Sequence, residues 1–189
     1  MKKLWNIAVI TIVTGLLLTG CNSKDNNYKI ESLNYIESSN NNNIDLNTAV
    51  SKVLIDDQSL MLNGEVLTEG HVILDKEETN DYIKVYLIAS GGNFGFEGDN
   101  FTIISGYSLV PMVIEFSKDE NNNLKLIKKE EPMDGSYYIE SLKNMFPYDL
   151  HKTVIHETER YREEIEKQQE LQAKDYLKSI NKEAKVIVN

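Results

Sequence analysis

The segment YIKVYLIAS, residues 82–90, decides the fold class of this 189-residue chain. In an extended chain, successive side chains point to opposite faces. One face of this segment then carries Ile83, Val85, Leu87 and Ala89, and the other carries Tyr82, Lys84, Tyr86 and Ile88. Apolar residues that recur with a period of two indicate a β-strand, so we expect this segment to lie in a sheet.

Further strand-like segments lie on both sides of it. HVILD at residues 71–75 precedes it, and FTIISGYS at 101–108, LVPMVIEFS at 109–117 and LKLIKKE at 124–130 follow. The connections are short and polar, which favours hairpins between consecutive strands. Pro111 favours a position at a sheet edge or a strand end, because proline cannot donate to the ladder.

A helix is predicted before the first strand. Residues 44–62 carry apolar side chains spaced by three or four, with Asp45 or Asn47 as the N-terminal cap. The dipeptide Asn63-Gly64 is typical of a helix end. With the strands, this order predicts an α+β fold: an antiparallel sheet of four to five strands, an N-terminal helix packed on it, and a long C-terminal helical region.

The C-terminal helical region is poor in apolar residues. Gln169 and Gln172 interrupt its thin apolar stripe, which argues against a strong coiled coil. We expect a mostly solvated helix that lies on the domain or projects from it. A helix that binds a partner or self-associates is the alternative. The expected division is an α+β domain at residues 45–147 and a C-terminal polar helix at residues 148–189.

The first twenty residues have the pattern of an export signal. Lys2 and Lys3 precede an uncharged stretch whose apolar core is shorter than the roughly 20 residues of a membrane span. The stretch ends in Leu18-Thr19-Gly20-Cys21, and Cys21 is the only cysteine. An uncleaved anchor helix and a buried N-terminal helix are the alternatives to a cleaved signal.

These last four residues resemble the bacterial lipobox. The resemblance implies that a diacylglyceryl group is attached to the Cys21 thiol and that residues 1–20, the signal peptide, are removed. Two acyl chains on one residue are enough for stable anchoring. The polar residues 21–44 would then form a flexible tether. We therefore expect a protein held by its lipid at the outer face of the cytoplasmic membrane.

The charge of the chain narrows its partners. Without residues 1–20, 18 basic side chains remain beside 30 acidic ones, and the net charge is −12. Binding of nucleic acid depends on cationic contacts to phosphates, so this charge argues against it. No cysteine is left for disulfides once Cys21 carries a lipid, so an ordinary hydrophobic core must stabilise the domain.

The three histidines are the first candidates for catalysis or metal binding. His151 and His156 lie about 140° apart around a helix, so they do not share a face. Arg160 occupies the place of the second histidine in a His-Glu-x-x-His motif that would start at His156. His71 shares a strand face with Asp75, but no nucleophile is marked beside this pair. We expect no metal site, no cofactor and no catalytic set.

The segment GGNFGFEGDN, residues 91–100, is predicted to be a glycine-rich hairpin loop. Its glycine spacing fits no phosphate-binding motif, and a strand follows it where such a motif needs a helix. Phe94 and Phe96 are candidate contacts for a protein partner if both point outward. Packing over the end of the sheet is the alternative. A ligand pocket here would need polar groups clustered beneath the segment.

The stretch from residue 64 to 177 resembles a known extracytoplasmic domain. The similar segments are EGH at 69–71, GFEG at 95–98, PMVIEFSKD at 111–119 and GSYYIESLKNMFP at 135–147. Such domains occur in small lipoproteins of low-GC Gram-positive bacteria and in some membrane-embedded antirepressor metallopeptidases of the beta-lactam-sensor type. The chain lacks the zinc motif and membrane helices of those peptidases. The resemblance therefore implies an accessory or sensory domain without peptidase or beta-lactam-binding activity.

The sequence as a whole predicts a membrane-anchored extracytoplasmic lipoprotein that serves as a non-catalytic binding, sensory or accessory module. Its expected partners are the membrane, through the lipid on Cys21, and a protein of the envelope, while the oligomeric state stays open. One alternative is an enzyme whose site is built from acidic and tyrosine residues. Another is a structural protein that interacts through its C-terminal helix.

Overall fold

The computed structural model describes residues 45–56 and 64–188, which belong to one compact unit, Ser32–Asn189. Residues 45–147 and the segment from 148 onward pack against each other within this unit. The predicted signal peptide, the tether and Cys21 lie outside the described residues. None of the described helices is long and apolar enough to span a membrane.

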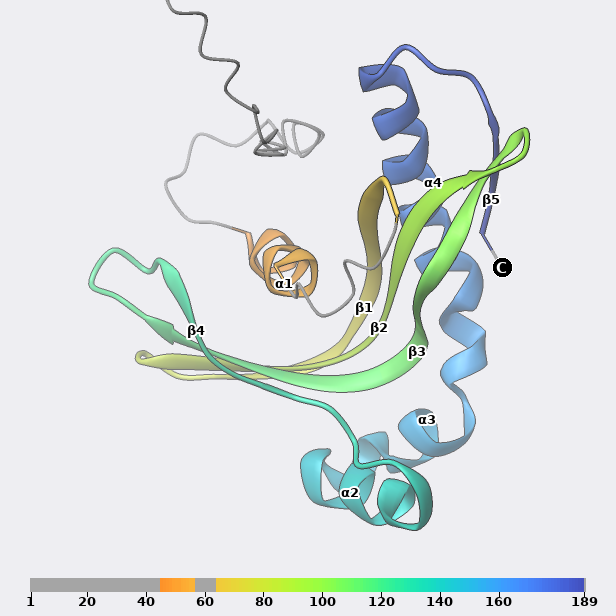
Figure 1. Ribbon diagram of the computed structural model, residues 1–189. Helices are drawn as coiled ribbons and strands as arrows, with labels where there is room; N and C mark the ends of the chain where they lie inside the picture. Colours follow the sequence, from red (N-terminus) through yellow and green to blue (C-terminus); the bar gives the residue numbers. More distant parts are fainter. Residues whose placement is uncertain (1–44, 57–63, 189) are drawn as a thin grey trace, which may run out of the picture. The chain divides into compact units, whose positions relative to one another are not determined.

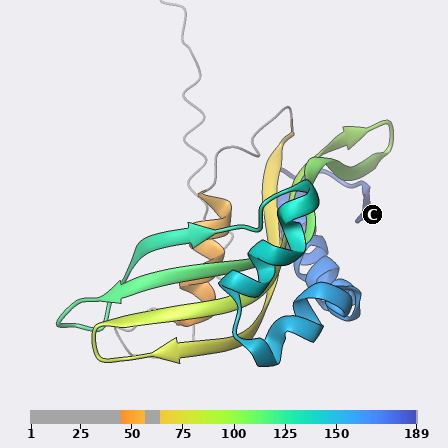
Figure 2. The ribbon, with the colours of Figure 1, turned by 90° about the horizontal axis from the view of Figure 1, so that it is seen from below.

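Four strands follow one another along the chain and lie in the same order in the sheet (Figure 2). They are β1 (Val66–Glu78), β2 (Tyr82–Glu97), β3 (Asn100–Lys118) and β4 (Leu124–Glu130), each antiparallel to the next. A short fifth strand, β5 (Lys185–Ile187), pairs in parallel with the start of β3. The predicted α+β class and its mainly antiparallel sheet are confirmed, whereas the parallel β5 has no counterpart in the prediction.

The glycine-rich segment after Ser90 is strand, and the predicted loop there is wrong. β2 continues through it to Glu97, and Gly92 lies opposite Thr68 of β1 and Gly106 of β3. The turn is confined to the two residues before Asn100, and there Gly98 has a φ of +60°. In the strand, the glycines allow close approach: a Cβ on Gly92 would lie 2.9 Å from the Nε2 atom of Gln169.

β3 is one strand where the sequence predicted two. A register shift against β2 lies beside Gly91, and Leu109 has a φ of 52° at this irregularity. Pro111 follows, in a part of β3 that has β2 on one side only, because pairing with β4 starts at Val113. Its missing N–H is therefore tolerated, in agreement with the predicted edge position.

Helix α1 (Leu46–Ile55) covers one face of the sheet (Figure 1). Its buried residues Ala49, Val50 and Leu54 pack on the face predicted for residues 82–90. The sheet residues in this cluster are Ile83, Val85, Leu87, Ala89, Met112, Ile114 and Phe116. The helix ends at Ile55, and its predicted extension through residues 57–62 lies outside the described residues.

The C-terminal helices cover the opposite face (Figure 1). They are α2 (Tyr138–Met145), α3 (His151–His156) and α4 (Arg162–Ser179), joined through short 3-10 turns at Tyr148–Leu150 and Thr158–Tyr161. Leu142 and Phe146 pack on Tyr86, and Ile165 packs on Ile88. The C-terminal helix therefore lies on the sheet, with a stripe of four buried residues: Ile165, Gln169, Ala173 and Leu177.

Candidate functional site

Two glutamines of α4 bind the outer edge of β1. The Oε1 atom of Gln172 accepts the Glu69 backbone N–H at 3.0 Å, and its Nε2 donates to the Glu69 carbonyl at 2.8 Å. Gln168 makes the same pair of bonds with the His71 backbone, both at 3.0 Å. These four bonds replace those of a further strand, so α4 covers an edge that would otherwise expose unpaired backbone groups.

The local sequence accounts for this docking. Glutamines four residues apart are separated by about 6 Å along a helix, which is close to the roughly 6.6 Å between alternate residues of a strand. Gly70, between the two bonded residues, lets the helix come near. A Cβ at this position would lie 2.3 Å from the carbonyl oxygen of Ile165. The glycine and the two glutamines together fix the position of α4 along β1.

A cavity of about 160 Å³ lies where α4 meets β2, β3 and the C-terminal segment. Its apolar wall contains Ile103 and Val188. Its polar wall contains Ser90, Ser108, Glu166 and Gln169. Gly91 is the first residue of the stretch under which a pocket would need polar groups, and the polar groups come from β2, β3 and α4. The register shift between β2 and β3 lies at the same place.

Gln169 is the unusual member of this cavity wall. Its side chain is only 2% exposed, and its buried Nε2 has no hydrogen-bond partner in the described part of the chain. A buried amide left without a partner costs about 1–3 kcal/mol. The neighbouring Gln168 and Gln172 each accept one hydrogen bond from β1 and donate one to it. Gln169 therefore marks a place where the folded chain holds a donor without an acceptor.

Ser90 contributes a second group whose hydrogen is available. Its hydroxyl oxygen accepts the backbone N–H of Leu109 at 2.9 Å, across the irregularity in β3. A hydroxyl that accepts one bond still has its own proton to donate. The side chain is 4% exposed, so this proton faces the protein interior or the cavity and not bulk water.

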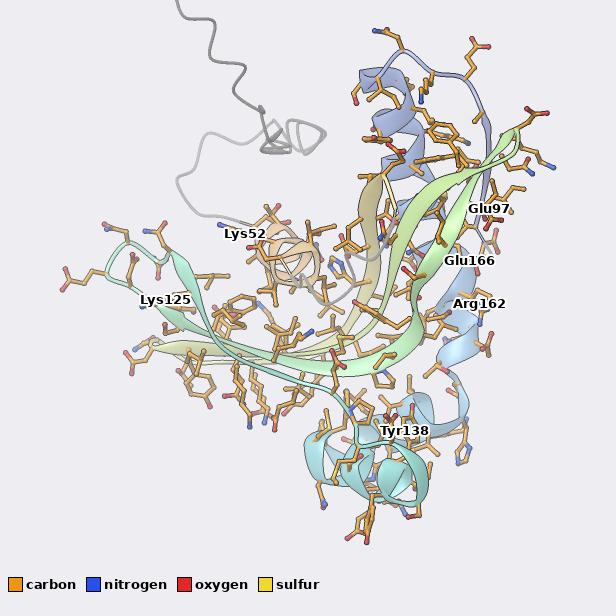
Figure 3. The ribbon with its side chains drawn as sticks, viewed as in Figure 1. Lys52, Glu97, Lys125, Tyr138, Arg162 and Glu166 are labelled. Carbon is orange, nitrogen blue, oxygen red and sulfur yellow. The ribbon has the colours of Figure 1, made fainter. Side chains whose placement is uncertain are left out.

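Arg162 holds the outer polar wall in place. Arg162 and Glu166 lie near each other on α4 (Figure 3). One terminal nitrogen of Arg162, Nη1, donates to the Glu166 carboxylate at 3.0 Å and to the Ser108 hydroxyl at 3.3 Å. Its Nε and Nη2 atoms bind Glu159 at 2.8 and 2.9 Å. These hydrogen bonds, to Glu159 first and then to Glu166, raise the pKa of the Arg162 guanidinium. The positive charge is thus shared between two carboxylates, and Glu166 is oriented beside the cavity.

A second polar cluster lies on the other face of the sheet, between α1 and β1. Glu69 and His71 are 3% and 7% exposed. The Glu69 carboxylate accepts the Ser51 hydroxyl at 2.7 Å and the Nδ1 of His71 at 2.9 Å. The Nε2 of His71 lies 3.3 Å from the Oδ1 of Asn47. The cluster is fully connected and ties α1 to β1.

This cluster has the residue types of a Ser-His-acid triad in the wrong order. In a triad the imidazole stands between the serine and the carboxylate, so that it can take the serine proton. Here the carboxylate of Glu69 stands between Ser51 and His71. The considered pairing of His71 with Asp75 is not formed, because a register shift separates Ile73 from Asp75 and the Asp75 carboxylate accepts the Lys76 N–H.

The other two histidines have separate environments. The Nε2 of His151 donates to the carbonyl oxygen of Phe146, just after the end of α2, at 2.9 Å, and its ring packs edge-on against Tyr148. His156 is the last residue of α3. Across residues 45–56 and 64–188, no group of three or more His, Cys, Asp or Glu side chains has a geometry that would hold a metal ion.

Phe94 and Phe96 pack within the domain. Phe94 is fully buried in a cluster with Phe101, Ala173 and Leu177, so it is not available to a partner. Phe96 is partly buried; its ring centroid lies 4.9 Å from that of Phe101, and the Lys182 ammonium lies 4.4 Å from its centre. Packing over the sheet end, the alternative considered from the sequence, describes both residues.

The sequence interpretation missed the α4 glutamines as site residues. It treated Gln169 and Gln172 as interruptions of an apolar stripe. The available signal was the occurrence of three glutamines, Gln168, Gln169 and Gln172, within five residues of a helix. Comparisons with protein-family models, curated proteins and solved structures give no match. The resemblance over residues 64–177 to an extracytoplasmic accessory domain therefore stays a prediction.

Proposed function

We propose that this chain is a membrane-anchored extracytoplasmic lipoprotein whose domain acts by binding. The anchor rests on the sequence Leu18-Thr19-Gly20-Cys21 after an uncharged stretch. The binding role is carried by one structural observation, the cavity against α4 whose wall contains the unpartnered amide of Gln169. A lipid-anchored accessory or sensory module at the outer face of the membrane combines the two.

An enzyme built from acidic and tyrosine residues has weaker support. The clearest contact of this kind joins Tyr86 to Glu77, with the phenol donating to the carboxylate at 2.6 Å. Burial, followed by this hydrogen bond, raises the pKa of Tyr86 well above its ordinary range. A general acid or base works best with a pKa near the operating pH, so this pair is poorly suited to proton transfer.

Interaction through the C-terminal helix also has weaker support. The buried stripe of α4 is already occupied by the sheet, and both Gln168 and Gln172 are bonded to β1. Leu171 is the large apolar residue that α4 leaves exposed, at 52%. One such side chain is ordinary for a protein surface and does not by itself indicate a docking face.

Metabolic labelling tests the anchor. Cells expressing the full chain and supplied with a radioactive fatty acid should incorporate label into the wild type and not into Cys21→Ser. Ser23→Ala, which leaves the four-residue motif intact, is the matched control and should label like the wild type. Cys21→Ser should also leave the membrane fraction. Equal labelling of Cys21→Ser and wild type would contradict the proposed anchor.

A further inference from the structure

The size of the cavity against α4 limits what it can hold. Its volume of about 160 Å³ is close to the roughly 150 Å³ of cavities that take up one benzene ring. A peptide or nucleotide would therefore extend well beyond it, and a single six-membered ring fits. The same volume would otherwise hold several water molecules, at about 30 Å³ each.

The polar wall determines which groups a ligand must present. Gln169 offers an N–H without a partner, and Ser90 retains its hydroxyl proton. Glu166 uses its Oε1 atom for Arg162, which leaves the second carboxylate oxygen to accept. A ligand that satisfies all three must both accept and donate hydrogen bonds. Hydroxyl groups do both, with one donor and two lone pairs each.

The remaining features concern shape and charge. Ile103 and Val188 form an apolar wall, which suits the C–H face of a saturated ring. The Glu166 carboxylate disfavours an anion, and the Arg162 charge is already shared by two carboxylates. The two donors, Gln169 and Ser90, do not favour a bare cation. A neutral ring with hydroxyls along its edge matches every wall.

We propose that this cavity binds the ring of a neutral monosaccharide or cyclic polyol, with a ligand oxygen accepting the Nε2–H of Gln169. The inference rests on the proposed binding function and deepens it by naming the ligand class. Ser90 and Glu166 bind further hydroxyls, and Arg162 acts as a positioning residue that orients Glu166.

The test is a titration of the isotope-labelled full chain in detergent micelles, followed by NMR. The probes are D-glucose, N-acetyl-D-glucosamine and myo-inositol, added separately. At least one probe should shift the side-chain amide resonance of Gln169 in a saturable manner. The amides of Gln168 and Gln172, which are bonded to β1, should move less.

Variants connect the signal to the cavity. Gln169→Met keeps the length of the side chain and removes the donor, so the affinity should fall roughly fivefold or more. Val188→Trp fills the cavity from its apolar wall and should abolish binding. Leu171→Ala changes an exposed residue of α4 outside the cavity and should bind like the wild type. Circular dichroism confirms that each variant is folded.

Three results would overturn the proposal: no saturable shift with any probe, unchanged affinity in both Gln169→Met and Val188→Trp, or a cavity occupied by ordered water only. Labelling of Cys21 is measured independently. If the protein incorporates fatty acid at Cys21 but binds none of the probes, the lipoprotein proposal stands and only the ligand class is removed. If the protein binds a probe but incorporates no fatty acid, the ligand class stands and the lipid anchor is contradicted.

Discussion

Glu69 accepts hydrogen bonds from two elements in the interior between α1 and β1. Ser51 donates from the helix and His71 from the same strand, and the carboxylate is 3% exposed. In a buried polar network, loss of one member leaves the remaining donors and acceptors unsatisfied. The Glu69 side chain thus adds a polar connection to the apolar packing that holds α1 on the sheet.

We expect Glu69→Ala to lose about 1–3 kcal/mol of unfolding free energy, because His71 and Ser51 both lose their acceptor. Urea denaturation followed by circular dichroism measures the loss. Glu120→Ala, in the exposed turn between β3 and β4, is the matched control and should stay within about 0.5 kcal/mol of the wild type. The double variant Glu69→Leu/His71→Leu should recover part of the loss. A Glu69→Ala protein as stable as the control would show that the cluster does not hold α1.

His71 illustrates which features of a single residue can be predicted from the sequence. Its place on a strand was predictable from the period of two in the segment that contains it. Its partner Glu69 was not, because it precedes the predicted strand segment 71–75, and the shift between Ile73 and Asp75 removes the expected partner. Ser51 and Asn47, which complete the cluster, come from a helix whose rotation about its own axis a sequence pattern fixes only approximately.

The contact between α4 and β1 joins a helix to the backbone of a sheet edge. Edge strands are commonly protected by charges, by bulges or by a covering element. Here Gln168 and Gln172 provide the covering element with hydrogen bonds of its own. The same contact fixes the position of α4 relative to β2. It therefore also fixes the position of Gln169 and of the cavity.

We expect the double variant Gln168→Ala/Gln172→Ala to be less stable by about 1–3 kcal/mol, because four hydrogen bonds are lost and water replaces them only in part. Native-state hydrogen exchange gives the sharper measurement. The amides of Glu69 and His71 should exchange slowly in the wild type and much faster in the variant. Lys167→Ala, on the same helix, is the control and should leave both rates unchanged. Equally slow exchange in the double variant would mean that other contacts hold α4 in place.

For the elements, the sequence was most informative where one periodicity ran unbroken. The strand through residues 82–90 follows from it. It failed at residues 91–97, because glycine has a turn propensity and no side chain to show a strand period. The actual requirement was space, for Gln169 of α4 at Gly92 and for Ile104 at Gly95. The parallel strand β5 spans only Lys185–Ile187 and depends on a partner more than eighty residues away.

Both faces of the sheet are covered by helices. This arrangement determines where the domain begins relative to the expected tether. α1 covers one face, and α2, α3 and α4 cover the other. The expected tether precedes α1 directly in the sequence. A domain defined from the first strand alone would therefore omit one of its layers, which the apolar spacing in residues 44–62 indicated.

We expect a fragment of residues 44–189 to fold like the full domain and a fragment of residues 57–189 to be strongly destabilised. The shorter fragment exposes the sheet face that Val50 and Leu54 cover, and burial of these two side chains contributes about 3–6 kcal/mol. It should bind a hydrophobic dye such as ANS and unfold at lower urea concentration. Within the longer fragment, Val50→Asp should reproduce the defect, and Lys52→Asp, at an exposed position of α1, should not. If the two fragments bind the dye equally and unfold at the same urea concentration, α1 is dispensable for the fold.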